Sequence, residues 1–181
     1  MKYKESKLKG LFIIEPNIYL DSRGYFFESF NNKDFEENTG FKINFLQDNE
    51  SKSQQNVLRG LHFQNNPFAQ GKLVRVIQGS VLDVAVDIRK ESDTYGQHIK
   101  KVLSAENKQM MYIPAGFAHG FITLENNTIF SYKCTNYYHK EAEGCILYND
   151  STLDIDWGVI SPILSEKDKL GEKFSSFVSK F

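Results

Sequence analysis

The hydrophobic residues of this chain occur in many short runs separated by turn residues. Residues 72–78 (KLVRVIQ) form one such run, rich in β-branched side chains and stopped by glycine. Runs of this length and composition predict β-strands. The predicted strands are residues 11–15, 25–30, 43–47, 57–64, 72–78, 81–88, 98–103, 109–113, 117–124, 128–135 and 145–148. Evenly spaced short strands predict an all-β sandwich or barrel, which can hold a ligand among its inward side chains.

Helix signals are rare, and turn signals are common. Residues 32–40 (NKDFEENTG) have an acidic start and a glycine stop, which predicts a helix, and the charged tail from Ser165 predicts a second, short one. Residues 21–24 (DSRG) predict a turn. Gly79 and Ser80 predict a hairpin turn between the strands on either side of them.

Alternation of side chains assigns a face to the residues of each strand. In residues 57–64 the period of two places Gly60 and His62 on one face and Arg59 on the other. If Arg59 and His62 act together, either the strand is irregular at Gly60, as in a β-bulge, or Arg59 reaches around the edge of the sheet. In residues 117–124, His119 shares its face with two phenylalanines, so it is either packed among them or an anion contact.

Composition restricts the function. The 181 residues are enough for one domain, expected to span 1–181, and 15 Phe with 9 Tyr favour a β-rich core. A formal charge of −1 argues against nucleic-acid or membrane-surface binding. The N-terminus has no apolar signal-peptide segment, and the two cysteines, Cys134 and Cys145, fit a reducing compartment. We therefore expect a cytoplasmic protein.

The segment from residue 47 to residue 72 holds the most informative chemistry. Arg59, His62 and Lys72 gather two cations and an imidazole on it, which favours a site for an anionic substrate with His62 as the group that moves a proton. A lone histidine is more often structural, but cations near a barrel interior need an anion. A carboxylate could orient His62, and Asp168 and Asp83 are the candidates.

A metal site is not expected, and a pair of tyrosines leaves two interpretations open. The four histidines are 62, 98, 119 and 139, and no two lie within four residues of each other, unlike the usual ligand spacings. Tyr132 and Tyr138, which follows Tyr137, are either aromatic packing or a general acid facing the base. By default, Arg23, Gln47 and Asn49 would be solvated.

Several ordered motifs nevertheless connect these residues. They are DSRGYFFESF, FLQDN, VLRGLHFQ, QGKLVRVIQGSVLDVAVDIR, YIPAGFAHGF, YKCTNYY, EAEG and IDWG. In sequence and order they resemble the dTDP-4-dehydrorhamnose 3,5-epimerase family. The resemblance implies a cupin-type double-stranded β-helix (jelly-roll) barrel with a few short helices. It also implies a homodimer without metal or cofactor that acts on a dTDP-linked 4-keto-6-deoxy sugar.

The resemblance further implies roles for individual residues. His62 would be the base, Tyr132 the acid and Lys72 the group that stabilises the enolate oxygen, with Asp168, or second Asp83, orienting His62. Tyr138 would stack on thymine. The other expected substrate contacts are Arg23, Glu28, Gln47, Asp48, Asn49, Arg59, His119, Glu143 and Lys167.

Three departures from the family pattern leave sister activities open. Glu50 replaces a usual His, Gly158 a usual Pro, and Gly144 rather than a basic residue follows Glu143. The alternatives are a single-carbon epimerase or a ketoisomerase on the same scaffold. Outside this class, the alternatives are a non-catalytic sugar-nucleotide-binding module and a metal-dependent cupin oxygenase.

Overall fold

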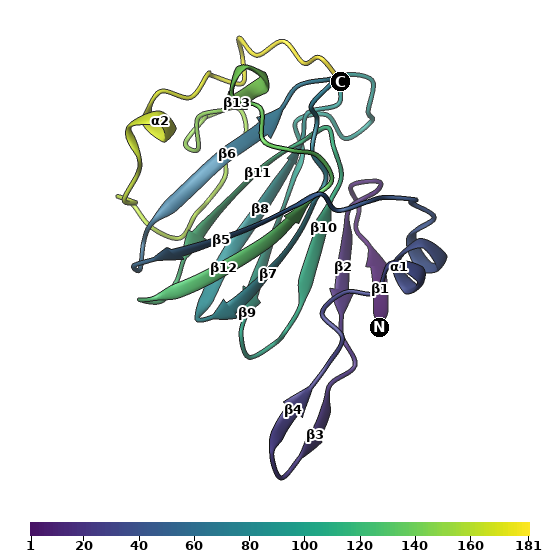
Figure 1. Ribbon diagram of the computed structural model, residues 1–181. Helices are drawn as coiled ribbons and strands as arrows, with labels where there is room; N and C mark the ends of the chain where they lie inside the picture. Colours follow the sequence, from purple (N-terminus) through teal and green to yellow (C-terminus); the bar gives the residue numbers. More distant parts are fainter.

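Two antiparallel sheets dominate the computed structural model, which describes residues 1–181 (Figure 1). The strands are β1 (Lys2–Glu5), β2 (Phe12–Glu15), β3 (Tyr19–Asp21), β4 (Gly24–Phe26), β5 (Gln47–Ser53), β6 (Leu58–Gln64), β7 (Lys72–Gln78), β8 (Ser80–Asp87), β9 (His98–Ser104), β10 (Met110–Ile113), β11 (Phe117–Thr123), β12 (Thr128–Cys134) and β13 (Glu143–Cys145). The helices are α1 (Asn32–Thr39), a 3₁₀ turn (Lys140–Ala142) and α2 (Glu166–Lys169). The predicted all-β jelly roll with few short helices is confirmed.

The sheets have six and five strands, in the orders β1-β2-β10-β7-β12-β5 and β13-β6-β11-β8-β9. One apolar cluster fills the space between them and includes Val74, Val81, Phe117 and Phe130. Two others cover the outer faces. The C-terminal segment with Trp157 covers the five-stranded sheet, and α1 covers the six-stranded sheet. The space between the sheets is therefore largely apolar, and a polar site is expected toward an open end of the barrel.

The elements with strong local signals form as predicted. The helix α1 is capped by Asn31, whose side chain accepts a hydrogen bond from the Asp34 amide, and it stops at Gly40 with φ of 75°. In β11, Phe117 and Phe121 join the interior cluster, and Ala118 and Ile122 join the outer one. The predicted alternation in residues 117–124 is confirmed.

The predicted hairpin at Gly79 and Ser80 is wrong. The strands on either side belong to different sheets, since β7 pairs with β10 and β12, and β8 pairs with β9 and β11. Gly79 is a corner at which the chain passes between the sheets. A Cβ there would lie 2.4 Å from the Thr128 hydroxyl at φ of 74°, so only glycine fits the corner.

Three strand predictions have wrong boundaries. Residues 43–46 are not a strand, and β5 begins instead at Gln47 and runs through polar residues to Ser53. The strand predicted over residues 25–30 ends at Phe26, and the one predicted over residues 145–148 is displaced to Glu143–Cys145. The strands that form there lack a buried apolar face: β4 is exposed, β5 is polar, and the three residues of β13 are only partly buried. Hydrophobic patterning therefore places them poorly.

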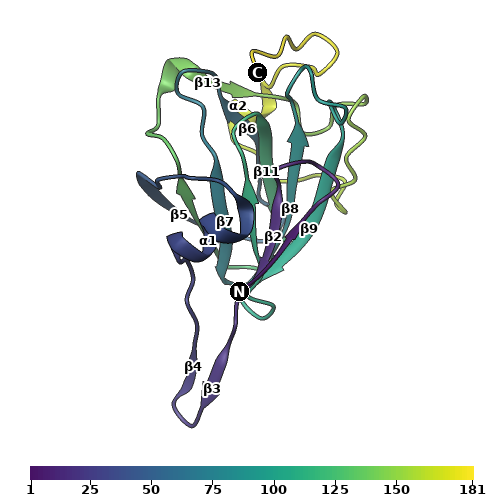
Figure 2. The same cartoon turned by 90° about the vertical axis from the view of Figure 1, so that its right-hand side faces the viewer.

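The hairpin of β3 and β4 projects away from the barrel in both views (Figures 1 and 2). Its apolar side chains are exposed, with Leu20 at 80% and Phe26 at 67%. Exposed apolar groups gathered on one element are typical of an interaction surface. None of the helices has the length and hydrophobicity needed to cross a membrane.

Candidate active site

The strand β6 carries Arg59 and His62 into one cavity because its regular alternation breaks at Gly60. His62 lies opposite His119 of β11, and Arg59 opposite Phe121, so β6 has one residue more than its partner between these pairs. Gly60 has φ of 136°, and a Cβ there would lie 2.4 Å from the Gly120 Cα. The predicted irregularity at Gly60 is confirmed, and it puts a cation and an imidazole on the same side of the sheet.

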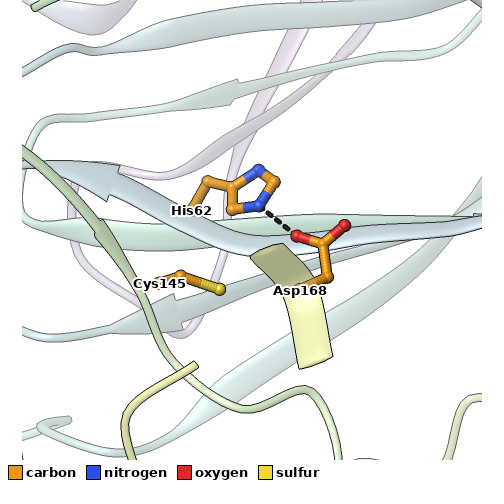
Figure 3. A group of neighbouring side chains, drawn as sticks. All are labelled: His62, Cys145 and Asp168. Atoms are coloured by element: carbon orange, nitrogen blue, oxygen red, sulfur yellow. Dashed lines mark hydrogen bonds and ion pairs between the residues drawn. The ribbon is translucent and has the colours of Figure 1, made fainter. Parts of the chain in front are cut away.

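His62 is bonded to a buried carboxylate. Its Nε2 lies 2.5 Å from Oδ1 of Asp168, and its other ring nitrogen faces away from Asp168 with no hydrogen-bond partner (Figure 3). Asp168 is on α2, where Ser165 caps the helix and donates its hydroxyl to Asp168 Oδ2 at 2.7 Å. Burial alone would raise the pKa of Asp168, but the hydrogen bonds from His62 and Ser165 outweigh it and hold that pKa below its usual value. An ionised Asp168 keeps the imidazole proton on Nε2 and leaves a lone pair on Nδ1.

Asp83 does not serve His62. Its two carboxylate oxygens each lie 3.0 Å from Nε2 of His119, deeper in the barrel. The expectation that Asp83 is the second candidate to orient His62 is therefore wrong. Burial raises the pKa of Asp83 and lowers the pKa of His119, and the His119 ring also stacks near Phe130. The packed alternative for His119 is therefore confirmed. Its ring also lines the cavity wall, where the anion contact stays a prediction.

A cavity of about 280 Å³ joins the His62–Asp168 pair to the other predicted groups. Its wall consists of Ser51, Arg59, His62, Lys72, His119, Phe121, Tyr132, Ser165, Lys167 and Asp168. Burial raises the pKa of the Tyr132 phenol, so it keeps its proton at neutral pH. Burial lowers the pKa of Lys72, whose ammonium makes no hydrogen bond or ion pair with the chain. The cavity thus offers a free lone pair, a phenol proton and an unpaired cation.

A second cavity, of about 310 Å³, shares His62, Lys72 and Tyr132 with the first and extends it outward. Its other wall residues are Gln47, Asn49, Phe63, Gln64, Gln70, Tyr138 and Glu143. The Tyr138 ring is half exposed, and its hydroxyl donates to Glu143 Oε2 at 3.1 Å. Lys167 also pairs with Glu143, so the expected contacts at Tyr138, Glu143 and Lys167 lie together.

Two glutamines fix the backbone around Tyr138. The side-chain oxygen of Gln47 accepts the Tyr138 amide at 2.9 Å. The buried Gln64 accepts the His139 amide at 2.8 Å and donates to the Tyr137 carbonyl at 3.1 Å and to the Phe68 carbonyl at 2.7 Å. The backbone that carries the Tyr138 ring is therefore held by glutamine side chains at residues 137–139.

Three expected substrate contacts lie outside these cavities. Arg23 is on the projecting hairpin and pairs with Asp21 at 2.6 Å. Glu28 lies beyond β4, and its carboxylate accepts a hydrogen bond from the side-chain amide of Asn31 at 3.2 Å. Asp48 pairs with Lys133 at 2.9 Å on the outer side of β5. Within one chain these three side chains do not reach the two cavities, and their expected substrate contacts stay predictions.

Comparison with known proteins agrees with this geometry. Residues 5–176 match the family model described as dTDP-4-dehydrorhamnose 3,5-epimerase. The chain belongs to the dTDP-4-dehydrorhamnose 3,5-epimerase family. It is 51% identical over 174 residues to the dTDP-4-dehydrorhamnose 3,5-epimerase of Shigella flexneri, with 96% of each protein covered. The family assignment makes the chain an isomerase and confirms the resemblance seen in its motifs.

Solved structures of the family share the fold over nearly the whole chain. The epimerase of Elizabethkingia anophelis NUHP1 superimposes with a TM-score of 0.93 at 51% identity, covering 97% of both chains. The epimerase of Legionella pneumophila Philadelphia 1, in complex with dTDP-4-keto-L-rhamnose, gives 0.93 at 48% identity and covers 98% of this chain and 94% of that one. The cupin-type assignment rests on these matches and on the strand order.

Sequence reasoning missed four residues of the epimerase site. Ser51 lines the cavity from β5, Ser165 holds Asp168, Gln64 positions the segment around Tyr138, and Cys145 lies beside His62. Ser165 had a readable signal, because a serine three residues before an aspartate is typical of a helix N-cap. Cys145 had none, since its position depends on the pairing of β13 with β6. Burial raises the pKa of its thiol to about 11.

Proposed function

We propose that this epimerase converts dTDP-4-dehydro-6-deoxy-D-glucose to dTDP-4-dehydro-L-rhamnose by inverting C3 and C5. The proposal rests above all on one observation, the shared cavity in which the His62–Asp168 pair faces Tyr132 and Lys72. It is supported by the relatives named above, which are 3,5-epimerases at about half identity.

Proton removal would fall to His62. The C4 ketone acidifies the protons on C3 and C5, and the Nδ1 lone pair takes one of them. The resulting imidazolium is stabilised by the ionised Asp168, whose oxygen already accepts the Nε2 proton. Asp168 thus acts as a positioning residue that fixes the tautomer and balances the charge.

Lys72 and Tyr132 would complete the transfer. Loss of the carbon proton places negative charge on the C4 oxygen as an enolate, and the unpaired ammonium of Lys72 is available to stabilise it. Tyr132 keeps its phenol proton and donates it to the opposite face of the same carbon. One base, one acid and one fixed cation suffice for the reaction, so the chain itself supplies the chemistry.

The nucleotide would occupy the outer cavity. Tyr138 offers a ring for stacking on thymine, and Gln47, Asn49 and Glu143 offer polar contacts beside it. Arg59 and Lys167 suit the negative charge of the substrate, as planar and point-charge donors respectively. His119, held by Asp83, would line the sugar end.

The decisive experiment is conversion of the 4-keto sugar nucleotide in D₂O followed by NMR. We expect the L-rhamno product with deuterium at both C3 and C5. His62→Ala should abolish exchange, and His98→Ala, which removes an imidazole from β9 outside both cavities, should retain it. Deuterium at neither position with tight dTDP binding would favour the sugar-nucleotide-binding module.

The second candidate is a single-carbon epimerase or ketoisomerase on a related sugar. It uses the same base and acid, and it differs in how the ring sits between them. It is supported by the departures from the usual family sequence at Glu50, Gly144 and Gly158. Incorporation at only one carbon, or a ketone moved to a neighbouring carbon, would establish it against the double epimerisation.

We further propose that the enzyme works as a homodimer in the cytoplasm. The projecting hairpin of β3 and β4 presents Tyr19, Leu20, Tyr25 and Phe26 to solvent, which suits burial against a second copy. Such docking would let Arg23 of one copy approach the cavity of another. Two free cysteines suit a reducing compartment. Light scattering should give a dimer mass, and Leu20→Glu should yield monomers.

A further inference from the structure

Three side chains with metal-binding atoms meet beside the cavity. They are His62, Cys145 and Asp168, and their ligand atoms all lie within 4.8 Å of one another (Figure 3). They come from β6, β13 and α2. Because they lie far apart in the sequence, ligand spacing along the chain does not reveal them. Imidazole nitrogen, thiolate sulfur and carboxylate oxygen are each ligands that zinc accepts in proteins.

The fold makes this meeting a fixed feature. Cys145 lies directly opposite His62 in the antiparallel pair of β13 and β6, so both side chains project from the same side of the sheet. The cysteine sulfur makes one long contact, 3.7 Å to the Ile146 carbonyl, which leaves it available. Asp168 is held from the third direction by Ser165. No large movement is needed to bring three ligands around one point.

Tetrahedral zinc requires modest adjustment of these groups. Zinc lies about 2.0 Å from nitrogen or oxygen and about 2.3 Å from sulfur, which puts ligand atoms roughly 3.3–3.7 Å apart. The Nε2 to Oδ1 distance of 2.5 Å must open by roughly 1 Å. The Cys145 sulfur lies within 4.8 Å of the other two ligand atoms, so it must approach them by about 1 Å at most, which rotation of its side chain can supply. A water molecule would complete the coordination as the fourth ligand.

Charge selects the kind of cation. Arg59, Lys72 and Lys167 line the same cavity and repel any dication. A thiolate from Cys145 and the carboxylate of Asp168 together neutralise one divalent charge. A hard cation such as Mg²⁺ gains little from sulfur, whereas Zn²⁺ binds thiolate well. The site therefore suits thiophilic metals only.

We propose that His62, Cys145 and Asp168 form an inhibitory site for a thiophilic divalent cation, represented by Zn²⁺. The proposal rests on the proposed role of His62 as base. On binding, the Cys145 thiol loses its proton to solvent, and the imidazole proton moves from Nε2 to Nδ1 as Nε2 becomes a ligand. The Nδ1 lone pair is then gone, and His62 can no longer accept the substrate proton.

Zinc titration of the cysteine variants tests the site. Metal-free enzyme is assayed for epimerisation at defined free Zn²⁺, set with a metal buffer because the substrate diphosphate also binds zinc. We expect Cys145→Ser and Cys145→Ala to need at least ~10-fold more free Zn²⁺ than wild type for half-inhibition. Chelator should restore wild-type activity, and equal Mg²⁺ should leave it unchanged. Cys134→Ser, normalised to its own metal-free rate, should keep wild-type sensitivity.

A second measurement reports binding without activity. Co²⁺ in place of Zn²⁺ should give a thiolate-to-cobalt charge-transfer band in wild type and Cys134→Ser, and none in Cys145→Ser. Equal zinc sensitivity in wild type and Cys145→Ser, or no cobalt band in wild type, would overturn the proposal. Metal-free wild type that binds cobalt through Cys145 but does not epimerise would instead refute the proposed function, so the two failures are distinguishable.

Discussion

Replacing Asp168 with asparagine tests the His62–Asp168 pair most directly. The change keeps the size of a side chain that is 3% exposed and removes its charge. A hydrogen bond to a charged group contributes about 1.5–3 kcal/mol, and 1.36 kcal/mol is tenfold in rate. Loss of imidazolium stabilisation alone should therefore lower kcat about 10- to 150-fold. KM should change little, because Asp168 holds His62 and we do not expect it to hold the nucleotide.

The hydroxyl of Ser165 should make the loss larger. Its oxygen already accepts the Asp168 amide, so it donates to Oδ2 of the side chain. In the asparagine variant this donor favours the carbonyl on the Ser165 side and the NH₂ group toward His62. Nε2 must then accept, the imidazole proton moves to Nδ1, and the base lone pair is lost. We expect kcat of Asp168→Asn to fall at or beyond the upper end of that range.

The double variant Asp168→Asn with Ser165→Ala separates the two effects. Without the hydroxyl the amide is free to turn its oxygen toward His62, so activity should recover toward the 10- to 150-fold level. The assays are steady-state epimerisation and C3/C5 proton exchange in D₂O, which should fall together because both need the base. Thermal unfolding checks the fold. An asparagine variant within threefold of wild type, or a double variant no better than the single one, refutes this reasoning.

Three further changes probe the acid, the cation and a structural carboxylate. Tyr132→Phe should slow epimerisation more than NMR-detected proton exchange, and equal losses would argue against Tyr132 as the acid. Lys72→Met should remove activity. It should also raise the free energy of unfolding, measured in urea, by about 1 kcal/mol, because an unpaired buried cation is costly. Unchanged or lower stability would contradict this. Asp87 is fully buried, and its hydrogen bonds, chiefly from Arg89, outweigh burial and lower its pKa. The contribution of the Asp87 carboxylate to stability is therefore present above about pH 4 and lost below it. Asp87→Asn should lower the free energy of unfolding by about 1.5–3 kcal/mol at pH 7 and by less at pH 3.5. The same difference between wild type and variant at both pH values would be evidence against this.

Strands with a buried apolar face could be predicted from the sequence, and the strand with a polar inner face could not. The strands β7 and β11 pack side chains into apolar clusters, so their positions follow from hydrophobicity. The strand β5 (Gln47–Ser53) turns alternate polar side chains, such as Asn49 and Ser51, into the cavities and the residues between them toward solvent. Both of its faces are polar, so it carries no apolar period. A strand that lines a polar cavity therefore lacks the hydrophobic alternation by which strands are recognised in a sequence.

The site was predictable where one strand carries the chemistry and not where the fold assembles it. His62 and Arg59 are neighbours on β6, and Gly60 between them signalled the irregularity that unites them. The choice between Asp168 and Asp83 depended on where α2 packs, which no local pattern reports. Cys145 depended on strand register in the same way.

The inner wall of this barrel divides by polarity, and that division links stability to function. At the apolar end, Val74, Phe121 and Phe130 pack as a core. At the polar end, Lys72 keeps an ammonium that makes no ion pair with any carboxylate of the chain, although burial disfavours its charge. Because the Lys72 ammonium lowers stability and makes no ion pair in its own chain, we infer that it is kept to interact with a negative charge of the bound substrate. The enolate oxygen is such a charge, and it exists only during the reaction, so the stabilising interaction is reserved for the transition state.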